Sequence, residues 1–378
     1  MGICGSTDNK QRNIKITKNA TETTEGPSHI KDKEIENQSG NKVNKEKHNS
    51  VAITSDVIVS RSEVNPEHIY KKMKLLGRGG FGEVWLVTHK ETHKDFAMKI
   101  IKKMSTNPNE EKLLMNEIQM LKSLDHPKIL KVLEFYSTPE QYYIITEYCA
   151  LGELFNELRK VEKFDEGQAA FLMNQIFRAV AYCHSQNVIH RDLKPENILI
   201  KSITDTVIKV IDFGSSSFIH DALSSYIQSR SYRAPEVIMG CNYDYKIDMW
   251  SLGCILAELY TGNVLFQSDS VQALLARVIG IIGPIPNWMF EKGKTIKTLF
   301  TKEKLLYMEA PETSEIGTSR GKKKMHIIIP KRSCLKKRLH CSDESFVDFV
   351  KWLLNIDPNK RPTAKEALNH KWLTQIKY

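Results

Sequence analysis

The chain has 378 residues, of which 41% are hydrophobic and 26% charged, with a formal net charge of +10 and seven cysteines. This length exceeds that of one small binding module and suits a large catalytic core with an extension. The composition is that of a globular protein and excludes a fibrous chain. Because the cysteines show no CxxC pair and no zinc-ligand spacing, we expect free thiols in a reducing, intracellular compartment.

Positive charge gathers in two places, the N-terminus and a basic segment at about residues 288–339. A solvated surface is the simpler interpretation of this segment, and a dock for phosphate or acidic groups is the alternative. No aromatic-rich basic motif accompanies the charge, so we expect no nucleic-acid binding. No apolar run reaches the roughly 18 to 20 residues that a membrane-spanning helix needs.

Residues 1–65 are predicted to form a disordered extension. Lys, Asn, Glu, Thr and Ser predominate between residues 10 and 48, so this segment cannot bury enough apolar surface to fold. From Tyr70 onward apolar residues alternate as in strands, and they recur at helical spacing between Leu113 and Leu121. Strands are expected again at residues 129–135 and 142–147, and helices beyond Leu151. A small strand-rich half therefore precedes a larger helical half, which predicts an α+β domain.

The first chemical motif is a glycine-rich run, GRGGFGEV at residues 77–84, between strand-like segments. Glycines permit a tight strand-turn-strand whose backbone N–H groups can approach a polyanionic phosphate closely. Alone the pattern is weak evidence, because dinucleotide-binding folds and plain glycine hairpins share it. The candidate nucleotide-binding residues here are Gly77, Arg78, Gly79, Gly80, Phe81, Gly82 and Val84.

A lysine follows in the next strand-like segment. Lys99 lies in FAMKI, where strand alternation puts its side chain on the same face as Ala97. A lysine among apolar neighbours needs an anionic partner, because an unpaired buried charge is costly. A phosphate and Glu117 can both serve. The alternative is a strand-edge lysine whose ammonium reaches water.

The second chemical cluster is HRDLKPEN at residues 190–197, which is followed by IDFG at residues 211–214. Phosphoryl transfer requires an oriented hydroxyl and neutralisation of charge on the transferred group. We predict that Asp192 accepts the hydroxyl proton and that Lys194 balances charge on the γ-phosphate. Asn197 and Asp212 are the predicted magnesium ligands, because Mg²⁺ prefers oxygen donors.

These residues, with APE at residues 234–236 and DMWSLG at residues 248–253, resemble the eukaryotic protein kinases over about residues 70–373. The resemblance implies a bilobal fold, with a small antiparallel-sheet N-lobe at about residues 70–148 and a larger helical C-lobe at about residues 149–373. It implies ATP and Mg²⁺ as cofactors and phosphorylation of Ser or Thr in protein substrates. It also implies an ion pair between Lys99 and Glu117, and a pair between Arg361 and Glu236.

The resemblance also assigns the adenine site. The hinge is expected at Glu147 to Cys149, with backbone groups that bind adenine. Thr146 is expected to limit the depth of the nucleotide pocket, and its small size should admit bulky ATP-competitive inhibitors.

The two halves of the chain resemble different kinases. Up to about residue 200, segments such as KLLGRGGFGEVWLV are similar to calcium-dependent protein kinases, but no calcium-binding loop follows, so no direct calcium binding is expected. From Val210 the chain resembles the dual-specificity tyrosine-regulated kinases of the CMGC group, as in SSYIQSRSYRAPEVIMG. The basic segment at about residues 288–339 fits the insert of that group.

The second resemblance implies regulation by phosphate on a tyrosine. Tyr226 occupies the position at which that family autophosphorylates. Arg230 and Arg233 are close enough in sequence to bind such a phosphate. Arg191 is a further candidate ligand, because it replaces the Cys of the His-Cys-Asp that is typical of those kinases.

Substrate choice is implied in the same way. Glu153 and Glu196 stand where related kinases bind an arginine upstream of the target residue, and solvated surface is the alternative for both. Arg233 usually accompanies a proline that follows the target. The expected substrate is therefore a Ser or Thr with upstream basic residues and a following proline.

The N-terminus MGICGS fits the pattern for N-myristoylation at Gly2, and Cys4 is a candidate for palmitate. A single myristoyl chain gives only marginal binding, so stable anchoring needs a second signal. We expect a monomer anchored peripherally at the cytoplasmic face of a membrane, and an unmodified N-terminus is the alternative. For the function, the alternative is a pseudokinase scaffold, which the presence of Lys99, Asp192 and Asp212 disfavours.

Overall fold

The computed structural model describes residues 59–61, 64–79, 82–103, 108–201, 206–221, 224, 226–309 and 325–375. All of them belong to one compact unit, Ser55–Tyr378. The proposed lipidation sites Gly2 and Cys4 lie outside the described residues, as do Gly80 and Phe81 of the glycine-rich run. No helix among the described residues combines the length and the apolar character that crossing a bilayer requires.

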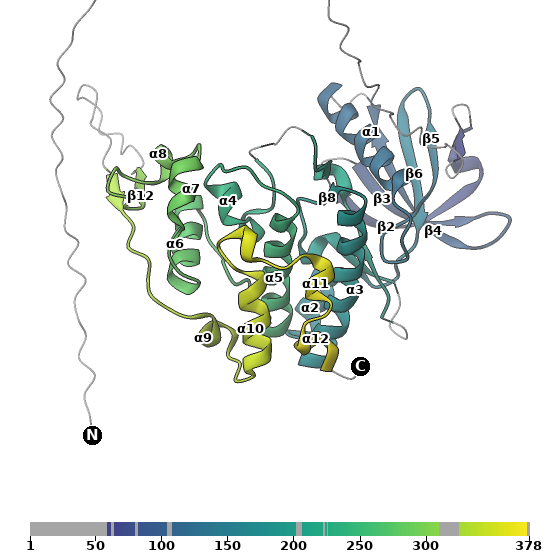
Figure 1. Ribbon diagram of the computed structural model, residues 1–378. Coiled ribbons are helices and arrows are strands. Elements are labelled where there is room, and N and C mark those ends of the chain that lie inside the picture. Colours follow the sequence, from purple (N-terminus) through teal and green to yellow (C-terminus); the bar gives the residue numbers. More distant parts are fainter. Residues whose placement is uncertain are drawn as a thin grey trace, which may run out of the picture. The chain divides into compact units, whose positions relative to one another are not determined.

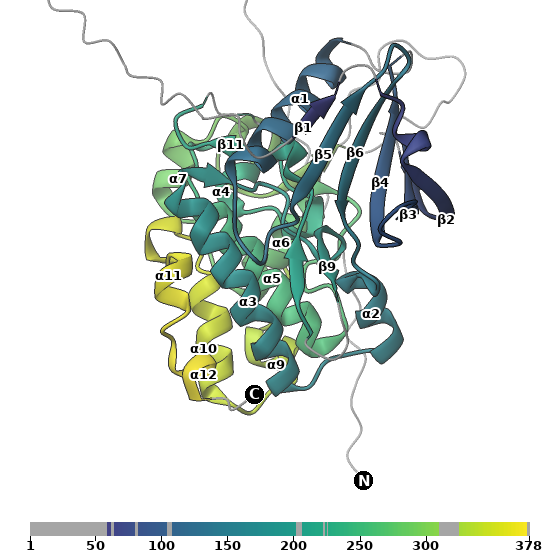
Figure 2. The same ribbon diagram turned by 90° about the vertical axis from the view of Figure 1, so that its right-hand side faces the viewer.

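The strand-rich half is a six-stranded sheet with the order β1-β5-β6-β4-β3-β2, and Figure 2 shows the strands side by side with helix α1 beside them. Apolar residues alternate between its two faces, as the period of a strand requires. One face buries Val87, Met98 and Ile145, and the other buries Ile101 and Ile144 with residues of α1. The elements are β1 (Val59–Arg61), β2 (Tyr70–Gly79), β3 (Gly82–His89), β4 (Asp95–Lys102), α1 (Pro108–Ser123), β5 (Val132–Ser137) and β6 (Gln141–Glu147).

Strand β1 differs from the expectation for the extension, which was predicted to be disordered to residue 65. It pairs in parallel with β5, and the short helix η1 (Pro66–His68) follows it. An edge strand has unpaired N–H and C=O groups, so a short segment gains backbone partners there without an apolar cluster of its own. Composition alone therefore could not reveal this strand.

The helical half is built around α5, whose residues Ile247 to Leu259 are all buried. A helix that is buried on all sides belongs in the centre of a core, and α3 and α10 lie beside α5 in Figure 1. The helices are α2 (Leu154–Val161), α3 (Glu166–Ser185), α4 (Pro235–Ile238), α5 (Lys246–Thr261), α6 (Val271–Ile281), α7 (Asn287–Lys292), α8 (Ile296–Leu299), α9 (Leu335–Leu339), α10 (Glu344–Leu353), α11 (Ala364–Ala367) and α12 (Lys371–Gln375).

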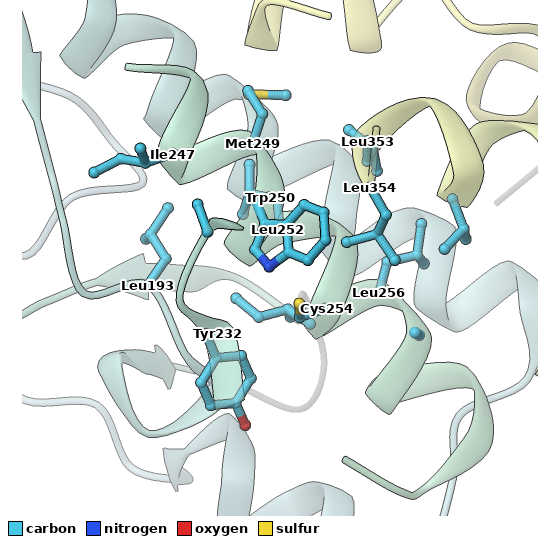
Figure 3. Close-up of a cluster of buried hydrophobic side chains, with 14 of the residues drawn as sticks. Leu193, Tyr232, Ile247, Met249, Trp250, Leu252, Cys254, Leu256, Leu353 and Leu354 are labelled. Carbon is cyan, nitrogen blue, oxygen red and sulfur yellow. The ribbon is translucent and has the colours of Figure 1, made fainter. Parts of the chain in front are cut away.

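Figure 3 shows the contact between α5 and α10, with Trp250 beside Leu353 and Leu354. A β-carbon on Gly253 would lie 2.8 Å from Leu354 Cδ2, so glycine permits this close approach. The Trp250 ring also stacks under the guanidinium of Arg361, with Cζ 5.1 Å from its centroid. Arg361 donates two hydrogen bonds to Glu236, of 2.6 and 2.7 Å, and both side chains are fully buried. This core fixes α4, which contains Glu236, and α5, which carries parts of the site.

Short strands and turns between the two halves carry the chemical motifs. Strands β7 (Gly152–Glu153), β9 (Ile198–Ile200) and β10 (Ile208–Val210) form one small sheet, and β8 (Val188–Ile189) pairs with β11 (Ser217–Phe218). The basic insert contains the hairpin of β12 (Tyr307–Glu309) and β13 (Met325–Ile327). The α+β architecture of a strand-rich and a helical half matches the sequence prediction.

Candidate active site

The described glycines of the glycine-rich run lie at the adjoining ends of β2 and β3, where Gly79 is the Cα partner of Gly82. Gly82 has φ of 126°, and a β-carbon there would lie 2.0 Å from the carbonyl oxygen of Ile100, so the position requires glycine. Arg78 Nη2 lies 2.7 Å from Glu83 Oε1 and joins the two strands near the turn. Gly77 pairs with Val84 in the ladder. The hairpin therefore holds its glycines next to β4, the strand that carries the lysine.

The register of the sheet gathers the candidate nucleotide-binding side chains on one face. Val84 is the Cα partner of Lys99, and Ala97 is the partner of Thr146. Paired residues project to the same face of a sheet, and so do residues two apart in one strand. Val84, Ala97, Lys99 and Thr146 consequently share one face of the sheet, the face on which Lys99 meets Glu117 of α1.

Lys99 meets the anionic partner that the sequence suggested. Its Nζ lies 3.7 Å from Glu117 Oε2 on α1, and both side chains are largely shielded from solvent. The pKa of Glu117 is raised, chiefly by burial. The Lys99 ammonium acts to lower this pKa, and the negative charge of Asp212 acts to raise it further. The pair thus connects β4 and α1, with the carboxylate of Asp212 close by.

A buried aspartate on α5 holds the catalytic loop. Asp248 Oδ2 accepts a hydrogen bond from the His190 N–H (2.9 Å) and lies 2.9 Å from His184 Nε2, and Oδ1 accepts from the Arg191 N–H (3.0 Å). Burial acts to raise the pKa of Asp248, but the bonds from His184 and His190 lower it below its ordinary value. These bonds hold Arg191 in a left-handed conformation with φ of 65°. The fixed loop then presents Asp192.

Asp192 is surrounded by donors. Lys194 Nζ lies 3.0 Å from its Oδ2, and the Ser229 N–H donates to its Oδ1 at 2.8 Å. The Lys194 ammonium also donates to Ser229 Oγ at 3.1 Å. Burial acts to raise the pKa of Asp192, but Lys194 and Ser229 outweigh it and the net shift is downward. The carboxylate is therefore ionised at neutral pH and can accept a hydrogen bond, and then a proton, from a hydroxyl.

Ser229 was not among the residues predicted from the sequence. It lies 37 positions after Asp192 and reaches it only through the fold of the activation segment. A hydroxyl that bonds the ammonium of Lys194 and a backbone N–H that bonds Asp192 orient both groups at once. Its position between the DFG and APE motifs was the only sequence signal for it.

The donor set for magnesium consists of one amide and one carboxylate. Asn197 Nδ2 donates to the Asp192 backbone oxygen at 2.9 Å, which leaves its amide oxygen as an acceptor. Asp212 has φ of 63° and ψ of 71°, which turns it from the β10 direction into the short helix η4 (Phe213–Ser215). In the described part of the chain, no group of three or more His, Cys, Asp or Glu side chains is arranged so that it could hold a metal ion. Two oxygen ligands suit Mg²⁺, which retains waters and takes phosphate oxygens as further ligands.

The DFG segment packs against the helical half. Phe213 is buried, and its ring centroid lies 4.8 Å from that of His190. His190 Nε2 lies 2.9 Å from the carbonyl oxygen of Ile211, so the residues on both sides of Asp212 are held. These contacts hold Asp212 close to the catalytic loop, and its charge also acts on the ion pair of Lys99 and Glu117. That is the arrangement that the resemblance to protein kinases implies for the catalytic groups.

The hinge residues lie where β6 ends. The carboxylate of Glu147 forms ion pairs with Lys201 (2.8 Å) and Lys209. The backbone of the hinge is therefore the part that remains to bind adenine. Burial raises the pKa of the Cys149 thiol to about 11. Thr146 Oγ1 lies 3.3 Å from the Glu147 carbonyl oxygen.

Glu153 and Glu196 come together, and a third carboxylate joins them. Burial and then the charge of Glu196 raise the pKa of Glu153. Glu196 Oε2 is buried and has no hydrogen-bond partner among the described residues. Glu258 on α5 accepts a 2.6 Å bond from the Tyr232 hydroxyl, and burial together with Glu196 raises its pKa to about 7. We refer to Glu153, Glu196 and Glu258 as the acidic pocket; the sequence signal for Glu258 was an acid in an otherwise apolar helix.

The residues of the activation segment are arranged differently from the expectation. Tyr226 is 82% exposed, and Arg233 Cζ lies 4.9 Å from its ring centroid. Arg230 instead donates to the Asp269 carbonyl at 2.7 Å, and Arg191 donates to the carbonyls of Ser215 and Ser216. The structure therefore brings only Arg233, of the three predicted phosphate ligands, to the Tyr226 ring, and all three donate to backbone carbonyls, Arg233 to those of Ile227 and Gln228.

The family model of the protein kinase domain matches residues 70–373. The chain belongs to the protein kinase family, and the predicted fold class is confirmed. Within that family it is similar to dual specificity tyrosine-phosphorylation-regulated kinase 2 of Drosophila melanogaster, at 33% identity over 82% of this chain and 42% of the relative. It is also similar to dual specificity tyrosine-phosphorylation-regulated kinase 3 of Mus musculus, at 33% identity over 81% of this chain and 54% of the relative.

A third similar protein is not named as a tyrosine-regulated kinase. Myosin light chain kinase A of Dictyostelium discoideum is 33% identical over 81% of this chain and 88% of its own length. The chain spans only about two fifths to a half of the fly and mouse kinases. The predicted resemblance to the tyrosine-regulated kinases is confirmed, and that to calcium-dependent kinases stays a prediction.

Proposed function

We propose that the protein transfers the γ-phosphate of ATP to Ser or Thr of protein substrates. The observation that carries the proposal is the convergence of Asp192, Lys194 and Ser229 in one hydrogen-bonded group. Asp192 orients the substrate hydroxyl and accepts its proton, and Lys194 neutralises charge on the transferred group. Magnesium-bound ATP supplies the phosphoryl group, and Asn197 and Asp212 hold the metal.

Lys99 and Glu117 complete the proposed assignment. The ammonium of Lys99 positions phosphates, and Glu117 keeps that ammonium in place. Phosphate transfer to a basic peptide tests the proposal, with Asp192→Asn as the inactive variant and Asp221→Asn as a control on the exposed surface. We expect transfer by the wild type and the control only. Equal rates in all three proteins, or none in the wild type, would contradict the proposal and favour the pseudokinase scaffold.

We propose that the acidic pocket selects an arginine upstream of the target residue. Glu196 supports this, because its buried Oε2 has no partner among the described residues. An unsatisfied buried acceptor gains a partner when a guanidinium binds. Glu153 and Glu258 add negative charge beside it.

A proline after the target residue is proposed for a separate physical reason. Gln228 has φ of 62°, and its carbonyl oxygen accepts a 2.8 Å bond from Arg233 Nη2. The carbonyl is therefore engaged and cannot accept a bond from the backbone N–H of the following substrate residue. Proline has no such N–H, so it loses nothing there, whereas other residues leave a donor unsatisfied.

Autophosphorylation of Tyr226 is proposed from its exposure and its neighbour. The side chain is 82% exposed, and the guanidinium of Arg233 already lies against its ring. A phosphate on this tyrosine gains a cation at short range, which would order the segment. Arg191 and Arg230 lie farther from the tyrosine, and all three arginines would exchange backbone carbonyl partners for the phosphate. Direct calcium regulation is not part of the proposal.

We further propose that the protein acts as a monomer held at the cytoplasmic face of a membrane by myristate on Gly2 and palmitate on Cys4. The N-terminal sequence pattern supports this, and a second acyl chain turns marginal binding into stable anchoring. Labelling with alkyne myristate, with Gly2→Ala as the unlabelled control, tests the first modification.

A further inference from the structure

The hairpin in the basic insert carries an exposed apolar strip. The ladder pairs Tyr307 with Ile327, and the backbone bond from Ile328 N–H to the Leu306 carbonyl (2.8 Å) continues the same register. In this register Leu305 lies opposite Ile329. Residues two apart project to one face, so Leu305, Tyr307 and Glu309 share a face with Met325, Ile327 and Ile329. Tyr307 is buried, and the exposed apolar strip consists of Leu305, Met325, Ile327 and Ile329, with Glu309 opposite Met325 at one end.

These side chains are unusually open to solvent. Ile329 is 82% exposed and Met325 53%, and the other two are also exposed. The neighbouring Leu306 and Ile328 point to the opposite face, where Leu306 is buried and Ile328 packs against the main core. Contiguous exposed apolar groups mark interaction sites, because burying them is favourable. An 82% exposed side chain protrudes and does not form the wall of a groove.

The strip is surrounded by positive charge. The described residues 287–309 and 325–340 contain ten Lys and Arg against three Glu, a net charge of +7, and all ten cations are exposed. Lys302 and Lys304 immediately precede the strip on one strand, and Lys331 and Arg332 follow Ile329 on the other. Neither Lys331 nor Arg332 forms an ion pair with another described residue. Their charge is therefore available to a partner.

We propose that this hairpin face binds an anionic membrane surface, with the apolar strip inserted between headgroups and the cations on phosphate and carboxylate groups. Protruding apolar side chains among lysines suit a headgroup layer, which has no fixed shape. A folded acidic protein would need to supply a complementary cavity. Figure 1 shows β12 beside α8 at the outer edge of the helical half.

The proposal is independent of the lipid anchor, and the test keeps the two apart. The full chain is produced in bacteria, which lack N-myristoyltransferase, and is sedimented with vesicles of phosphatidylcholine alone or with about 30% phosphatidylserine. We expect binding only to the anionic vesicles. Lys331→Gln/Arg332→Gln should weaken it roughly 30-fold, since each basic residue contributes about a factor of five. Ile329→Ser should weaken it roughly tenfold.

The matched control is Lys71→Gln/Lys74→Gln, which removes the same charge from exposed positions of β2. The affinity of this control for anionic vesicles should stay within about twofold of the wild-type affinity, because screening limits the effect of distant charges. Unfolding midpoints equal to the wild type establish that each variant is folded. Equal binding to both kinds of vesicle, equal loss in the control, or no binding by the wild type would overturn the proposal. So would binding to soluble polyglutamate as tight as to vesicles, which would indicate an acidic protein partner.

Discussion

Neutralising Glu196 tests the acidic pocket as the site of arginine selection. Its buried Oε2 has no partner among the described residues, so an incoming guanidinium would satisfy it. A hydrogen bond to a charged group contributes about 1.5–3 kcal/mol, which corresponds to roughly 10- to 150-fold in kcat/KM. We expect Glu196→Gln to lower kcat/KM by that factor for a peptide with an upstream arginine. For the same peptide with alanine in place of the arginine, kcat/KM should change little.

The assay measures kcat/KM for both peptides with the wild type, with Glu196→Gln and with Glu157→Gln. Glu157 lies on α2 and pairs with Lys160 at 3.0 Å, so its substitution removes a charge without entering the pocket. The ratio of the two kcat/KM values should fall in Glu196→Gln alone. An unchanged ratio in that variant, or an equal fall in the control, would refute the reasoning.

The pocket should also depend on pH. Burial and the charge of Glu196 raise the pKa of Glu258 to about 7. A carboxyl with a raised pKa loses its charge as the pH falls through that value, whereas arginine stays protonated. The preference for arginine should therefore rise between about pH 6 and about pH 8, and Glu258→Gln should flatten the rise. A preference that falls over this range would contradict the role of Glu258.

Three further changes have defined outcomes. Arg361→Met should lower the free energy of unfolding, measured in urea, by about 3–5 kcal/mol, because it leaves the buried Glu236 carboxylate unpaired. The double variant with Glu236→Leu should recover part of this loss. Wild-type stability of the single variant would count against a stabilising role of the ion pair. Thr146→Met should weaken a bulky ATP-competitive inhibitor relative to ATP, and wild-type sensitivity would argue against Thr146 as the limit of the pocket. In cells of a host with N-myristoyltransferase, Gly2→Ala should move the protein from the membrane to the soluble fraction, and an unchanged distribution would indicate an unmodified N-terminus.

The residues that sequence reasoning could place lie in contiguous motifs. His190 to Asn197 and Ile211 to Gly214 are single short segments, so their chemistry is visible before any folding. The relation of Lys99 to Ala97 followed from strand alternation, and the ladder shows the partners Val84 and Thr146 on the same face. The strand-rich and helical halves were predictable from hydrophobic periodicity.

Other residues become part of the site only through tertiary contacts. Ser229 reaches Asp192 through the activation segment, and Glu258 reaches the pocket from the middle of α5. The only sequence signals were the position of Ser229 between two motifs and the acidic residue Glu258 within a largely apolar helix, and neither signal indicates which residues the side chain meets. The role of Gln228 depends on its positive φ and on the bond from Arg233, which residue type alone does not predict. Strand β1 likewise depends on an open edge of β5 that composition cannot reveal.

The most direct test of the central claim, that this protein is an active kinase, is phosphosite mapping by mass spectrometry after expression in bacteria. The wild type is compared with Asp212→Asn, which keeps the shape of the side chain and removes the charge of a proposed magnesium ligand. We predict phosphate on Tyr226 and on Ser or Thr residues of the wild type, and none on the variant. The same phosphosites in both proteins, or none in the wild type, would contradict the account.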